Sequence, residues 1–155
     1  MKLLFIDLGN YCRSPVAEAM VGAELARHGL ADRVQVSSAG IEAHHLGDGA
    51  HPMTVASASA RGIDLSAHRC RQIAPDDFSR FDLILAVDGD SLARLQLLCP
   101  AAARGRLGLL LSYAPEIGLS DIPDPNRQAP EAFGRVLDLT QRAAESLVST
   151  LRARL

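Results

Sequence analysis

Cysteine is scarce in this sequence, with three residues in 155, no C-x-x-C pair and no spacing typical of a metal site. A small, odd number of thiols argues against a disulfide framework and fits the reducing cytoplasm. Long apolar runs are also lacking: no stretch approaches the about 18 residues of a membrane-spanning helix, and the apolar residues before Asp7 are too few for a signal peptide. We therefore expect a cytoplasmic protein that does not bind membranes and has no metal or other cofactor.

An excess of charge of either sign is lacking too. The 16 lysines and arginines nearly balance the 18 aspartates and glutamates, which gives a formal net charge of −2 at pH 7. This balance argues against a broad basic surface for nucleic acids, so any anion must be bound by a local site. With 48% hydrophobic residues, 22% charged residues and no internal repeat, we expect residues 1–155 to form one domain with a sizeable core.

The stretch from Lys2 to Pro15 (KLLFIDLGNYCRSP) has the pattern of a strand, a tight turn and the start of a helix. An apolar run ends at Asp7, and Ser14 followed by Pro15 is typical of a helix N-cap and a first helical residue. Backbone N–H groups of such a turn have no intrahelical partner, and they converge at the positive end of the helix dipole. An arginine in the turn adds a planar, two-donor group for an oxyanion. The predicted anion-binding loop consists of Leu8, Gly9, Asn10, Tyr11, Cys12, Arg13 and Ser14.

Strands and helices are predicted to alternate along the rest of the chain. Residues 83–87 (LILAV) form an apolar run typical of a buried strand in a parallel sheet, and three- and four-residue apolar spacing from residue 130 onward predicts a long amphipathic helix. We predict strands over 2–7, 34–36, 83–87 and 107–111, and helices over 15–28, 52–61, 75–80, 91–98 and 130–155. This order indicates an α/β fold, a single-domain four-stranded parallel sheet with helices on both faces and the anion-binding loop after strand 1.

Residues 120–127 (SDIPDPNR) form the second segment of interest. Pro123 and Pro125 push the residues before them into extended conformations, so this segment is predicted to be a loop. The loop holds Asp124 between the two prolines, which restricts where its carboxyl group can lie. Asp-Pro is a common turn dipeptide, but a restricted carboxyl group is also a candidate general acid.

Residues 8–15 (LGNYCRSP) match the phosphate-binding loop of the low-molecular-weight protein tyrosine phosphatases, and the sequence resembles this family along nearly its whole length. The further matches are Ser37-Ser38-Ala39-Gly40, His68, Arg71-Gln72-Ile73, Phe81-Asp82, Asp88 and Asp124-Pro125. The resemblance implies hydrolysis of phosphotyrosine or similar phosphate monoesters. It also implies a phosphorylated protein or small aryl phosphate as partner, and binding of inorganic phosphate or a similar oxyanion.

The same resemblance implies roles for single residues. Arg13 and the loop amides would hold the phosphate group, and Asp124 would protonate the leaving oxygen as the general acid. Asn10 would brace the loop through Ser38 and His68.

One position departs from the family pattern, because Asp7 stands where the resemblance places the nucleophilic cysteine, to which Ser14 would donate a hydrogen bond. A carboxylate could form an acyl phosphate, but aspartyl phosphatases usually add a metal and a second aspartate two residues on, where this chain has Gly9. We therefore predict very low turnover. The presence of Arg13, Ser14 and Asp124 favours an active enzyme altered at this one position over a degenerate relative.

We expect different roles for the three cysteines. The resemblance implies that a loop cysteine at position 12 can protect the nucleophile through a reversible disulfide. Without a thiol at position 7, Cys12 is expected to be a buried thiol whose pKa is lowered by Arg13 and the helix start. Cys70 and Cys99 are expected to be packing residues.

Two other functions stay open. One is a binding module for phosphorylated ligands that never turns over. The other is an arsenate reductase, because some of these share the fold and the loop; that chemistry needs further cysteines on a nearby mobile segment, for which Cys70 and Cys99 are the candidates.

The residues that follow the Asp124-Pro125 pair bear on substrate preference. Where the family often has aromatic residues after the Asp-Pro pair, this chain has Asn126 and Arg127. Arg127 could favour acidic or smaller phosphorylated substrates, or be a surface arginine without such a role. Tyr11 and His44 or His45 are the remaining candidates to flank a substrate ring.

Overall fold

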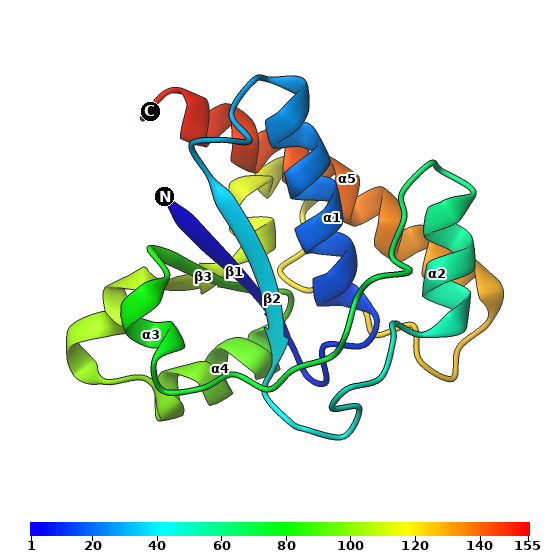
Figure 1. Cartoon of the computed structure of the whole chain (residues 1–155), viewed down its shortest axis with the longest axis horizontal. Helices are drawn as coiled ribbons and strands as arrows, with labels where there is room; N and C mark the ends of the chain where they lie inside the picture. The colour runs from blue at the N-terminus through cyan, green and yellow to red at the C-terminus, as the bar shows by residue number, and fades with distance from the viewer.

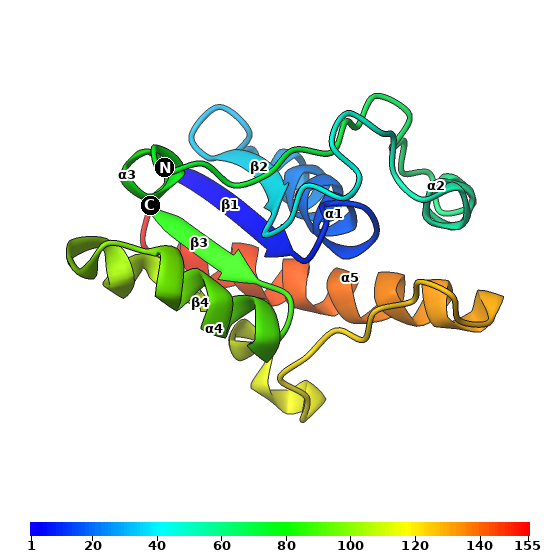
Figure 2. The same cartoon turned by 90° about the horizontal axis from the view of Figure 1, so that it is seen from below.

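A computed structural model describes all 155 residues. Four parallel strands form one sheet in the order β2-β1-β3-β4. They are β1 (Lys2–Asp7), β2 (Gln35–Gly40), β3 (Leu83–Ala86) and β4 (Leu107–Leu109). Figure 2 shows β1 and β3 pointing the same way, so the loops that follow them leave the sheet at the same end. The predicted α/β fold with a four-stranded parallel sheet is confirmed.

Helices cover both faces of this sheet (Figure 1). The α1 helix (Arg13–Arg27) and the α5 helix (Pro130–Arg152) pack against one face and against each other. The short α3 helix (Asp77–Arg80) and the α4 helix (Gly89–Leu98) cover the opposite face. The α2 helix (Pro52–Ser59) packs against α5.

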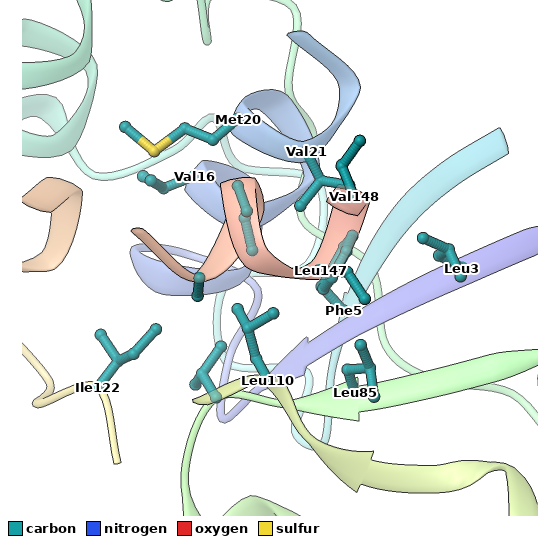
Figure 3. Close-up of a cluster of buried hydrophobic side chains, with 14 of the residues drawn as sticks. Leu3, Phe5, Val16, Met20, Val21, Leu85, Leu110, Ile122, Leu147 and Val148 are labelled. Atoms are coloured by element: carbon teal, nitrogen blue, oxygen red, sulfur yellow. The ribbon is translucent and has the colours of Figure 1, made fainter. Parts of the chain in front are cut away.

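Alternation along β1 explains why the sheet needs both layers. Leu3 and Phe5 point into the larger core, which Figure 3 shows filled by Val16 of α1 and Leu147 of α5. Leu4 and Ile6 belong to the smaller core under α3 and α4. Fully burying one such side chain contributes about 1.5–3 kcal/mol, so the central strand is held firmly from both sides.

The boundaries of α1 and two strands differ from the prediction. α1 begins at Arg13, two residues early, with Cys12 rather than Ser14 at the N-cap. β2 extends to Gly40 because its last residues continue to pair with β1 as far as Asp7. β4 is shorter than predicted and only half-buried: it pairs with β3 alone, and the chain turns into a 3₁₀ helix at Leu110.

The other predicted helices are present with ends shifted by a few residues, and three 3₁₀ helices were not predicted: Ala101–Arg106, Leu110–Tyr113 and Pro115–Ile117. Gly29 adopts a left-handed φ of 70° just after α1, as a helix-ending glycine does. None of the helices combines the length and apolar character required to cross a membrane.

Candidate active site

The loop of residues 8–14 closes around the side chain of Asp7 at the carboxyl end of β1. Asp7 is only 2% exposed. Its carboxylate accepts hydrogen bonds from the backbone N–H groups of Asn10 (2.5 Å), Arg13 (3.1 Å) and Ser14 (2.9 Å). The loop amides therefore converge on one buried, negatively charged group, which is the arrangement that binds oxyanions at a helix start.

Asn10 fixes the shape of this loop. Its φ of 58° lies in the left-handed region, and the residue is fully buried. Its side-chain amide donates to the hydroxyls of Ser14 (2.8 Å) and Ser38 (3.0 Å), and its side-chain oxygen accepts the N–H of Arg71 (2.9 Å). An unusual backbone conformation persists where the surroundings over-determine it, as these three bonds do.

The main-chain carbonyl of Asn10 is bound as well. The Nε2 atom of His68 lies 2.8 Å from this oxygen, and the Cys70 thiol donates to it at 2.9 Å. Arg71, next in the chain, forms a two-point ion pair with the buried carboxylate of Asp77 (2.9 and 3.2 Å). The structure thus brings Asn10, Ser38 and His68 together, and the segment that carries His68 is itself anchored.

Gly40 allows the end of β2 to approach the loop. A Cβ atom at this position would lie 2.7 Å from the backbone nitrogen of Asn10 and 2.7 Å from the carbonyl carbon of Gly9. Only glycine fits there without moving the loop, so the last residue of β2 acts as a backbone support for it.

Arg13 is 4% exposed, and its guanidinium is held by two acceptors. Its Nη1 donates to Asp88 Oδ2 (2.6 Å) and to the carbonyl of Ile122 (2.8 Å). Asp88 also caps α4 by accepting the N–H of Ser91 (2.8 Å). Burial alone would raise the pKa of Asp88, but the hydrogen bonds from Ser91 and the charge of Arg13 outweigh it and keep this pKa below its ordinary value.

Asp124 lies on the solvent side of this arginine. Its Oδ2 is 4.0 Å from Arg13 Nη2, and its side chain is 48% exposed. Its Oδ1 accepts the N–H of Asn126 (3.0 Å), which closes a turn within the 120–127 loop. The structure therefore brings Asp124 to the place where Asp7 and Arg13 lie, although it is far from both in the sequence.

These residues line one pocket of about 420 Å³. On one side of it, the ring of Tyr11 stacks on the ring of His45, with centroids 3.7 Å apart and planes inclined by 8°. The full lining is Asp7, Leu8, Gly9, Tyr11, Cys12, Arg13, His44, His45, Asp124, Asn126 and Arg127.

The expectation of a lowered pKa for the Cys12 thiol is wrong. Burial raises the pKa of the Cys12 thiol to about 12, and Arg13, already paired with Asp88, offsets only a small part of that cost. The expected hydrogen bond from Ser14 to position 7 is present: its backbone N–H donates to Asp7 (2.9 Å), and its hydroxyl oxygen accepts from Asn10.

Several contacts at the site were not predicted from the sequence. The Arg13–Asp88 ion pair was not assigned, although Asp88 directly follows the third strand and matches the family pattern. Cys70 is more than a packing residue, because it contacts the carbonyl of Asn10. The contact between Arg13 and the carbonyl of Ile122 could not be predicted from residue types, because every residue carries a backbone carbonyl.

Comparison with known proteins shows the family of this chain. Residues 2–155 match the family model described as low molecular weight phosphotyrosine protein phosphatase. A putative low molecular weight protein-tyrosine-phosphatase from Synechocystis is 36% identical over 152 residues, which covers 97% of this chain and 96% of the relative. The chain belongs to this phosphatase family. The resemblance found in the sequence is thereby confirmed.

Two solved structures have the same fold as this chain over nearly its whole length. The crystal structure of a protein tyrosine phosphatase from Entamoeba histolytica, with Hepes in the active site, gives a TM-score of 0.95 at 32% identity and covers 100% of this chain and 99% of that one. YfkJ from Bacillus subtilis gives a TM-score of 0.93 at 30% identity and covers 99% and 96% of the two chains.

Proposed function

We propose that this member of the phosphatase family binds phosphate monoesters in the pocket above the 8–14 loop and that its hydrolysis of them is severely limited at Asp7. The observation that carries the proposal is the set of three amides bound to the Asp7 carboxylate. An oxyanion entering the pocket would meet the loop amides and Arg13. It would also meet a carboxylate that already uses part of the hydrogen-bonding capacity of the loop.

The limit on hydrolysis follows from the chemistry at position 7. A thiolate there would attack phosphorus, the bond to the leaving oxygen would break, and Asp124 would give that oxygen its proton. Water would then release phosphate from sulfur, with Asp124 taking the proton of the water. The Asp7 carboxylate is a weaker nucleophile, and three hydrogen bonds stabilise it further in its unreacted state.

The proposed substrates are phosphorylated tyrosine in proteins and small aryl phosphates. Tyr11 and His45 offer a flat wall for a ring, and the rim of the pocket carries Asn126 and Arg127. All three cysteines are free and buried, which supports the proposal that the protein works in the reducing cytoplasm.

The test compares this chain with Asp7 in place, Asp7→Cys and the double variant Asp7→Cys/Asp124→Asn, with p-nitrophenyl phosphate and a phosphotyrosine peptide as substrates. We expect near-background rates for the chain with Asp7 and clear hydrolysis by Asp7→Cys. In the double variant, loss of the acid should lower hydrolysis by about 10²- to 10⁴-fold for a poor leaving group.

Two results would contradict the proposal. Hydrolysis by the chain with Asp7 as fast as by Asp7→Cys would show that Asp7 is a competent nucleophile. A folded Asp7→Cys variant that binds phosphorylated ligands without hydrolysing them would instead favour a binding module.

A further inference from the structure

The 120–127 loop touches the rest of the protein at few points. Between residues 119 and 129, the hydrogen bonds to other parts of the chain are those of Asp121 and Ile122. Ile122 is fully buried; its N–H donates to the carbonyl of Val87 (2.9 Å), and its carbonyl accepts from Arg13 (2.8 Å). The remaining bonds in this stretch are local turns, such as the one between Asp124 and Asn126.

Asp121 supplies the other attachment. Its Oδ1 accepts the N–H of Gly89 at 2.8 Å, while the hydroxyl of Ser120 is more distant, at 3.4 Å. Gly89 is the first residue of α4, so its N–H has no partner inside the helix and lies at the positive end of the helix dipole. Asp88, the N-cap of the same helix, pairs with Arg13. The start of α4 therefore binds both the phosphate-site arginine and the 120–127 loop.

We infer that Asp121 is a positioning residue for the general acid Asp124. Pro123 and Pro125 restrict the backbone on both sides of Asp124, so fixing the chain at residues 121 and 122 limits where the Asp124 carboxyl can lie. Asp124 has no buried contacts of its own to hold it, since its side chain is 48% exposed and 4.0 Å from Arg13. This inference rests on the proposed role of Asp124.

The test uses leaving groups of different basicity in the Asp7→Cys background. Phenyl phosphate needs a proton on its leaving oxygen, whereas 2,4-dinitrophenyl phosphate does not. We expect Asp121→Ala to lower kcat/KM for phenyl phosphate by about tenfold, part of the full contribution of a general acid, and that for the dinitrophenyl ester by less than about twofold. The quantity compared is kcat/KM because it reports formation of the phosphoenzyme, whereas the later release of phosphate from sulfur, in which Asp124 also acts, is common to both esters. Asp121→Asn should retain most activity, because its amide oxygen can still accept from Gly89.

Asp82→Ala is the matched control. Asp82 also accepts a single backbone N–H, that of Lys2 (2.7 Å), but at the opposite end of the sheet. Its replacement removes the same kind of bond and should slow neither ester selectively. An equal fall in kcat/KM for both esters in Asp121→Ala, or no fall for either, would overturn the inference.

A readout independent of activity separates this inference from the proposed function. If Asp7→Cys hydrolyses neither ester, the proposed function fails, and the attachment is tested by amide hydrogen exchange in the protein that keeps Asp7. Asp121→Ala should then accelerate exchange of the Ile122 amide while the Val87 amide, bonded to Ile6 within the sheet region, stays protected. Unchanged exchange at Ile122 would overturn the inference in that case as well.

Discussion

The floor and the open side of the pocket are built in opposite ways. The floor, residues 8–14, is braced by β2, by the segment carrying His68 and by α1, and its key residue Asn10 is fully buried. The open side, residues 120–127, is attached through Asp121 and Ile122, and its Asp124 is half-exposed. The binding geometry is therefore rigid before any ligand arrives, whereas the placement of the acid depends on a few bonds that single substitutions remove.

Thiol reactivity gives the sharpest contrast between the two regions. In the floor, burial raises the pKa of Cys12 to about 12, so its thiolate is scarce at neutral pH. A cysteine introduced by Asn126→Cys on the open side should keep a pKa near about 8.5. At pH 8 we expect iodoacetamide to label position 126 at least about 10³-fold faster than Cys12, as read by peptide mass spectrometry.

The rate of Cys12 labelling should depend on pH in a definite direction. Because its pKa is raised, Cys12 labelling should keep increasing from pH 7 to pH 10, whereas labelling at position 126 should level off above its pKa. Fast labelling of Cys12 at pH 7 would mean that the loop opens in solution or that Arg13 activates the thiol.

Two asparagines provide the next comparison. Asn10→Ala removes three side-chain hydrogen bonds and leaves buried partners such as the N–H of Arg71 unsatisfied, so unfolding free energy should fall by about 2–4 kcal/mol. Asn126→Ala keeps its backbone bond to Asp124 and should change stability by less than about 0.5 kcal/mol. Urea denaturation measures both.

A glycine variant refines that comparison. Asn10→Gly loses the same hydrogen bonds, but glycine adopts the left-handed φ of 58° without strain. The glycine variant should therefore be less destabilised than Asn10→Ala. Similar stability of Asn10→Ala and Asn126→Ala would contradict the view that the floor is the rigid part.

Sequence patterns predicted the parts of the molecule that local chemistry determines. The apolar run of β3, the amphipathic spacing of α5 and the turn after Asp7 each depend on neighbouring residues, and each was found near its predicted place. The family resemblance, carried by residues 8–15, then added the pairing of Asn10 with Ser38 and His68 as an expectation.

Contacts between residues far apart in the sequence determine the features that were not predicted. Ser14 reads as an N-cap from its neighbours, but Asn10 engages its hydroxyl and the helix begins earlier. The lowered thiol pKa expected for Cys12 assumed a free Arg13, whereas the fold pairs this arginine with Asp88 and buries the thiol. Such effects depend on which charges the tertiary structure brings together.

The most direct test is a titration of the ¹⁵N-labelled protein with inorganic phosphate, followed by NMR, in the chain with Asp7 and in Asp7→Ser. We predict saturable shifts of the amides of residues 8–14 in both proteins, with tighter binding in Asp7→Ser, because the variant removes the carboxylate that shares the loop amides. Shifts confined to surface arginines, or no saturable shift in Asp7→Ser, would contradict the conclusion that this loop is an oxyanion site.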